Sequence, residues 1–191
     1  MKEYIVVVSV CLLISGGAIA AEIDTDSRIT ESRGVVKAFL AELKGRLVSA
    51  IKEGGPTHAI PVCNEQAPII ADKFSTENGW RVARTSLKLR NPGNAPDAWE
   101  KNVLESFEAR KASGEDPQKI EYAEVVQQGD ALVFRYMKAI PTAEIPCLMC
   151  HGDAIAKPLA AKLDQFYPED QARGYKAGDI RGAFTITQPI K

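Results

Sequence analysis

The chain lacks a strong excess of charge of either sign. Its 24 Lys and Arg residues nearly balance its 25 Asp and Glu residues, and the formal net charge is −1. No basic stripe runs along the sequence, which argues against a nucleic-acid partner. Internal repeats and low-complexity tracts are also missing. The composition that remains is that of a soluble globular domain.

Histidine and cysteine are scarce, and this limits which side chains could hold a cofactor. The 191 residues include only two histidines, His58 and His151, and four cysteines. Two of the cysteines and one histidine fall within five residues, Cys147-Leu148-Met149-Cys150-His151. This C-x-x-C-H pattern is the attachment signature of a c-type haem. Its thiols can form thioethers with the two vinyl groups on one porphyrin edge, and the adjacent imidazole becomes the proximal iron ligand.

The N-terminus indicates the compartment in which this motif would act, since a cytosolic C-x-x-C is more often a redox or metal pair. After Lys2 comes an apolar run at residues 4–14, and Ala18-Ile19-Ala20 offers an A-x-A cleavage site. We therefore expect residues 1–20 to be a signal peptide and residues 21–191 a single haem-binding domain in the periplasm. The competing interpretation is an uncleaved membrane anchor, although the apolar run is short for one.

Cleavage would remove Cys11 and leave an odd thiol, Cys63, in an oxidising compartment. Such a thiol calls for an explanation. It could be buried as a small hydrophobe, or it could bind the iron on the face opposite His151. From the residues alone, His58, Met137 and an open position are the alternatives to Cys63 as the distal ligand.

The hydrophobic pattern predicts an α+β fold. Apolar residues recur at helical spacing over residues 35–51, and Gly54-Gly55-Pro56 should end this helix. Further predicted elements are a helix at 58–78 interrupted at Pro68, a strand at 80–90, and a helix capped by Asp97 that ends near Lys111. A hairpin at 121–126 and 131–140, a helix at 154–166 and a strand at 179–188 complete the prediction. Helices followed by an antiparallel sheet indicate the α+β class.

The chain resembles a family of exported c-type haem proteins that is defined as a domain of unknown function and has a PAS-like fold. Four segments carry the resemblance: AIPVC at 59–63, RNPGNAPDAWE at 90–100, CLMCHG at 147–152 and GDIRGA at 178–183. It extends over about residues 30–188. It implies a PAS-like antiparallel sheet flanked by helices, with a long N-terminal helix. It also implies one covalently attached haem c whose iron is held by the motif histidine, His151, and an upstream cysteine, Cys63.

A His/thiolate haem would have a low potential, because a thiolate donates electron density to the iron. We expect a non-enzymatic protein that senses redox state or a diatomic gas, with release of Cys63 as the switch and a separate redox or signalling partner as the output. The alternative is a low-potential electron-transfer cytochrome. A haem enzyme with His58 as its acid–base group and a haem-free dithiol protein are weaker alternatives.

Three arginines are candidates to pair with the haem propionates, since guanidinium suits carboxylates. They are Arg84, Arg90 and Arg181, and we expect at most one to do so because most arginines are solvated surface. Trp80 and Trp99 could wall the haem pocket, although burial in a core is the commoner fate of tryptophan.

Overall fold

A computed structural model describes residues 23–190 of the protein. The predicted signal peptide therefore lies outside the described residues. Within the part that is described, no helix is both long and apolar enough to cross a membrane.

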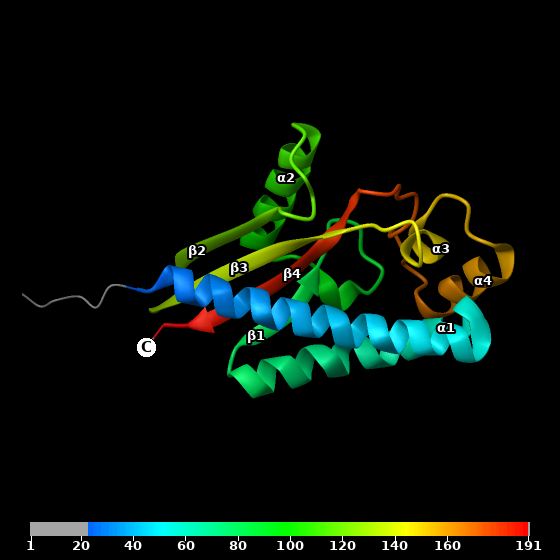
Figure 1. Ribbon diagram of the computed structural model, residues 1–191, viewed down its shortest axis with the longest axis horizontal. Coiled ribbons are helices and arrows are strands. Elements are labelled where there is room, and N and C mark those ends of the chain that lie inside the picture. The colour runs from blue at the N-terminus through cyan, green and yellow to red at the C-terminus, as the bar shows by residue number, and fades with distance from the viewer. Residues whose placement is uncertain (1–22, 191) are drawn as a thin grey trace, which may run out of the picture.

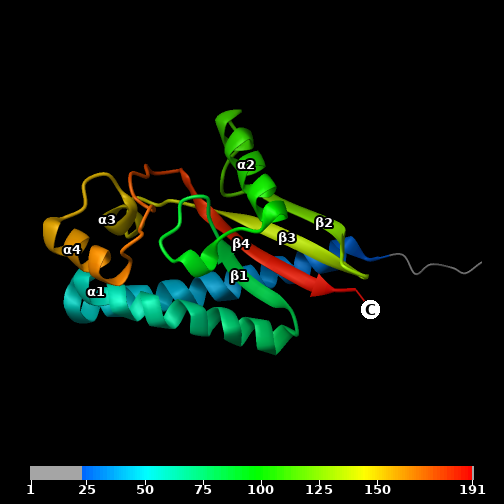
Figure 2. The ribbon, with the colours of Figure 1, turned by 180° about the vertical axis from the view of Figure 1, so that it is seen from behind.

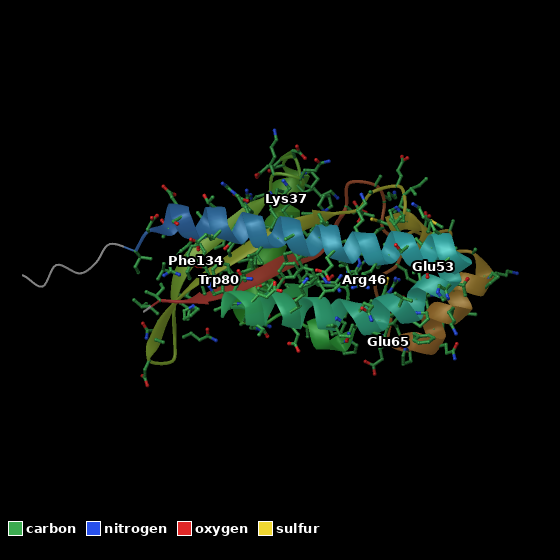
Figure 3. All side chains as sticks on the ribbon, turned by 60° about the horizontal axis from the view of Figure 1, so that its bottom comes forward. Lys37, Arg46, Glu53, Glu65, Trp80 and Phe134 are labelled. Carbon is green, nitrogen blue, oxygen red and sulfur yellow. The ribbon has the colours of Figure 1, made fainter. Side chains whose placement is uncertain are left out.

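The first element, α1 (Thr25–Asn78), is a helical hairpin (Figure 1). Inside it, the backbone leaves the helical region at Gly55, which has φ 78° and ψ 179°. Glycine reaches positive φ without a Cβ clash, and Pro56 then suits the first turn of the second half. Figure 3 shows the two halves side by side, with the exposed Lys37, Arg46 and Glu53 on the first half and Glu65 on the second. The predicted stop at residues 54–56 is confirmed.

The sheet contains four antiparallel strands in the order β1-β4-β3-β2. The strands are β1 (Arg81–Thr85), β2 (Glu121–Gln128), β3 (Ala131–Pro141) and β4 (Ile180–Pro189). β2 and β3 form the predicted hairpin, and Gly129 takes positive φ (61°) in its turn. The predicted α+β class, with a long N-terminal helix and an antiparallel sheet, is confirmed.

Helices cover both faces of the sheet (Figures 1 and 2). Both halves of α1 pack on one face, where Phe39 and Phe74 meet Phe134 and Phe184. On the other face lies α2 (Ala98–Ala112), whose Phe107 is buried in the core between this helix and the sheet. Its N-terminus has the predicted cap: the Asp97 side chain accepts a hydrogen bond from the Glu100 N–H, and the Glu100 carboxylate accepts one in return.

The C-x-x-C-H motif forms a short helix of its own, α3 (Cys147–His151), followed by α4 (Lys157–Phe166). Both lie near the bend of α1, away from α2 (Figure 2). Ile60 of α1 packs with Leu159 and Leu163 of α4 in a small separate core, against which Cys150 also rests. A 3₁₀ turn, η1 (Pro92–Asn94), lies in the loop after β1.

Two local predictions were wrong. α1 continues through Pro68, since a proline removes one N–H donor and can bend a helix without ending it. The strand predicted at 80–90 ends at Thr85. Beyond it, the Ser86 hydroxyl accepts a hydrogen bond from the Lys88 N–H (3.2 Å) and lies 2.8 Å from the Arg181 carbonyl oxygen. These contacts replace a strand ladder with a bend.

Gly182 allows this close approach between β1 and β4. A Cβ at Gly182 would lie 2.3 Å from the Thr85 carbonyl oxygen. We expect Gly182→Ala to lower the free energy of unfolding by about 1–3 kcal/mol, because the strands must separate. Gly45→Ala is the matched control. At this exposed helical position an added Cβ meets nothing, and alanine favours the helix over glycine, so the free energy of unfolding should rise by about 1 kcal/mol. Urea unfolding of both variants measures the difference, and equal effects would contradict the steric argument.

Candidate functional site

A cavity of about 370 Å³ lies between the two halves of α1, β1, the η1 loop and α3. This volume is in the range of small-molecule and cofactor pockets. Its α1 wall combines larger apolar side chains from the first half, Leu43, Leu47 and Ile51, with Ala59, Cys63, Ala67 and Ala71 from the second. The small side chains leave room beside the helix for a flat ligand.

The cavity brings together the residues that the sequence singles out. Cys147, Cys150 and His151 of α3 line one part of it, and Cys63 of α1 also lines it. The thiols of Cys63, Cys147 and Cys150 are all free. Burial raises the pKa of the Cys63 thiol, and the nearby Cys150 adds to this effect.

The other proposed distal ligands lie elsewhere. Met137 is fully buried in the core between the sheet and α2. His58 is exposed, with its Nε2 atom 4.0 Å from the Glu53 carboxylate, and it does not line the cavity. Trp80 and Trp99 do not line it either and pack against the two sheet cores. Of the candidates named from the sequence, Cys63 is therefore the one placed with His151.

The His151 imidazole is held by the loop that follows α4. Its Nδ1 atom lies 2.8 Å from the Ala172 carbonyl oxygen. If Nδ1 carries the proton and donates to this oxygen, Nε2 keeps its lone pair, as in metal-binding histidines, and the nearest donor to it is Arg90 Nη1 at 3.5 Å. Burial, with the nearby Arg181 and Arg90, lowers the pKa of His151 well below its usual value. The imidazole is thus neutral, which is the form that binds metals.

Arg90 fixes the position of α3. Its Nε and Nη2 atoms donate to the two carboxylate oxygens of Asp170 at 3.1 and 3.0 Å, and Nη2 lies 2.6 Å from the Cys150 carbonyl oxygen. Both side chains are buried, with 11% of Arg90 and 1% of Asp170 exposed. Asp170 also accepts from the N–H of Ala172, whose carbonyl faces His151. One buried ion pair therefore orients both the motif and its histidine.

The cavity is cationic. Its described lining includes Arg84, Arg90 and Arg181 but no Asp or Glu side chain. Burial, and then Arg181, lowers the pKa of Arg84 to about 10, which leaves Arg84 charged at neutral pH. The site therefore attracts a ligand that carries negative charge.

Sequence reasoning missed Tyr167 and Asn64, which also line the cavity, and Asp170 behind it. Tyr167 and Asp170 lie in a segment without a motif, so nothing in their spacing identifies them. The loop at residues 91–94 contributes Asn91, Gly93 and Asn94 to the lining.

The fold and the cavity define an α+β protein whose ligand site is built around a C-x-x-C-H helix. A family model described as Tll0287-like matches residues 18–189, and the chain belongs to this family. The crystal structure of the cyanobacterial heme-protein Tll0287 is similar to this chain, with 27% sequence identity and a TM-score of 0.59. The match covers 84% of this chain and 96% of that protein. No curated protein matches the chain.

The residues of the cavity fit a c-type haem. Two free thiols at the required spacing would attach it, a neutral imidazole with a fixed Nδ1 atom would bind the iron, and Cys63 could approach from α1. The unmatched cationic charge suits the porphyrin carboxylates.

Removing one partner of the Arg90–Asp170 pair should destabilise the protein strongly. We expect Arg90→Met to lower the free energy of unfolding by about 3 kcal/mol, because the buried Asp170 carboxylate loses one of its two arginine partners and keeps only Arg173. The double variant with Asp170→Asn should lose less than the sum of the two single changes. Lys101→Met, which breaks an exposed pair with Glu105, is the control and should change the free energy by less than about 0.5 kcal/mol. Additive effects at Arg90 and Asp170 in denaturant unfolding would rule out the coupling.

The same pair gives the stability a pH dependence. Burial alone would raise the pKa of Asp170, but hydrogen bonds from Arg90 and Arg173 outweigh it and hold the pKa below its usual value. A lowered folded-state pKa adds stability that is complete above the unfolded pKa of about 3.9 and is lost as the pH falls further. The difference in unfolding free energy between the wild type and Asp170→Asn should therefore shrink below about pH 4. A difference that stays constant down to pH 3 would contradict this assignment.

Proposed function

We propose that this protein is a periplasmic monohaem c-type protein that senses redox state or a diatomic gas, with His151 and Cys63 as the axial ligands. The observation that carries the proposal is the shared cavity of Cys63, His151 and the two motif thiols. The family membership and the haem protein among its structural relatives support the cofactor. The signal peptide expected from the sequence supports export.

In this proposal each residue has a defined task. Cys147 and Cys150 attach the porphyrin, and His151 binds the iron through Nε2 while Nδ1 donates to Ala172. The haem, when bound, supplies one-electron redox chemistry and a position where a diatomic gas can bind. Cys63 donates electron density as a thiolate, which favours the ferric state and gives a low potential. If reduction or gas binding displaced Cys63 from the iron, the second half of α1 would lose its bond to the haem.

Electron transfer is the second candidate function, and one feature favours it. Ile145 is 80% exposed and lies two residues before Cys147, and Met149 is exposed between the motif cysteines. Apolar side chains at the attachment edge of a haem would suit brief contact with a redox partner. We propose no catalytic role, because the one imidazole left for acid–base chemistry, His58, lies outside the cavity.

The distal ligand can be tested by absorption spectroscopy of ferric protein matured with covalent haem. Cys63→Ala should keep the haem attached and change the ligation state, because the thiolate-to-iron charge transfer is lost. His58→Ala is the matched control and should leave the spectrum unchanged, since His58 is outside the cavity. The assignment is overturned if the Cys63 variant keeps the wild-type spectrum or if the His58 variant alters it.

Gas binding by the reduced protein distinguishes a sensor from an electron carrier. For a sensor, we expect carbon monoxide or nitric oxide to bind reduced wild-type protein as Cys63 leaves, and Cys63→Ala to bind the gas at least about tenfold faster. A carrier keeps both ligands in both oxidation states. Stopped-flow absorption measures the rates. Reduced wild-type protein that neither binds gas nor changes ligation would leave electron transfer as the function.

A further inference from the structure

In the described part of the chain, two of the three cavity arginines lack a counter-ion. Asp170 neutralises Arg90. Within residues 23–190, neither Arg84 nor Arg181 lies within 4.0 Å of a carboxylate oxygen, and the cavity lining contains no acidic side chain to supply one. The described part of the cavity thus carries two positive charges in excess.

These two arginines lie on neighbouring strands. Arg84 of β1 pairs in register with Phe184 of β4, the strand on which Arg181 lies. The Arg84 guanidinium lies 5.9 Å from the centre of the Phe39 ring and makes no hydrogen bond to another described residue. The positive charge of Arg181 is close enough to repel that of Arg84. Two desolvated like charges without a partner are costly unless a ligand supplies the opposite charge.

Arg181 gains a free donor when His151 binds a metal. Its Nε atom lies 3.1 Å from His151 Nδ1, and its Nη1 atom lies 3.0 Å from the Ser86 hydroxyl. Nδ1 cannot accept from Arg181 while donating to the Ala172 carbonyl. A metal on Nε2 requires the proton on Nδ1 and so selects the Ala172 contact. The Arg181 Nε–H is then available to another acceptor.

We propose that Arg84 and Arg181 form a receptor for the two propionate carboxylates of the haem. The charges match, two guanidinium groups for two carboxylates, and guanidinium binds carboxylates in a bidentate geometry. The receptor includes two of the three candidate arginines, where the sequence indicated at most one. Arg90 is left out because Asp170 already neutralises its charge. The inference rests on the proposed haem function. A free inorganic anion is the other source of the same charge.

Reversible porphyrin binding tests the receptor. The full mature chain with Cys147→Ala and Cys150→Ala would be titrated with iron protoporphyrin as the free acid and as the dimethyl ester. We expect the free acid to bind at least about tenfold more tightly than the ester. Arg84→Met should weaken free-acid binding about tenfold, so that the affinities for the free acid and the ester differ by less than about threefold. Arg84→Lys should keep part of the preference for the free acid.

Arg81→Met is the matched control. Arg81 lies on the same strand, outside the cavity lining, and pairs with Glu100 of α2, so its loss should leave the preference for the free acid unchanged. The receptor is overturned if the parent chain binds the two porphyrins equally, or if Arg84→Met weakens both by the same factor, as a packing defect would.

Thermal unfolding gives a second readout, on protein that keeps its motif cysteines. Arg84→Met should raise the Tm of the haem-free protein, because an unpaired charge is removed, and lower the Tm of the covalently loaded protein, because a carboxylate loses its partner. A change of the same sign in both states overturns the proposal.

Inorganic phosphate is the competing probe. If it raises the Tm of haem-free protein only when Arg84 is present, and the ester binds as well as the free acid, the arginines bind a free anion and the propionate receptor is overturned. A chain that acquires no haem at all would instead refute the haem function itself.

Discussion

The buried ion pair between Arg90 and Asp170 is the constraint on which the site depends. Arg90 belongs to the loop after β1, and Asp170 belongs to the loop between α4 and β4. The guanidinium also contacts the Cys150 carbonyl, so three segments distant in sequence meet at one side chain. Because α3 has only five residues, it cannot hold its own position by helix packing. The ion pair holds α3 in position, as packing along a longer helix would otherwise do.

The same pair determines the electrostatic character of the cavity. Of the three arginines that line the cavity, Asp170 binds only Arg90, and Arg173 and the Ala172 N–H use its remaining lone pairs. Arg84 and Arg181 therefore line the cavity with no carboxylate partner among residues 23–190. In a pocket of low dielectric, this excess charge favours an anionic ligand over a neutral one of the same shape. The geometry that fixes the histidine thus also sets the charge of the ligand that can bind beside it.

The sequence was sufficient for those features that depend on local rules. The helical spacing over residues 35–51, the Gly55 bend, the Asp97 cap and the hairpin all follow from neighbouring residues, and so does the C-x-x-C-H segment. Features that depend on distant contacts were missed. The strand after Trp80 is shorter than its alternation indicates because Ser86 bonds across to β4. Asp170 and Tyr167 reach the site only through the path of the loop after α4, which no motif marks.

The two sides of the proposed haem differ in how firmly the protein holds them, and this favours sensing over electron carriage. His151 is fixed by Ala172 and, through Arg90, by Asp170. Cys63 lies on a helical segment between Pro61 and Pro68, and each proline leaves the carbonyl four residues earlier without its helical donor. The second half of α1, which includes this segment, begins at the Gly55 bend and continues to Ile70 and Phe74 in the sheet core. A carrier gains from two rigid ligands, because reorganisation slows electron transfer. The helix around Cys63 is weakened by the prolines, bent at one end and packed on the sheet at the other. Under the proposed ligation, it is suited to convert loss of Cys63 from the iron into movement of the hairpin.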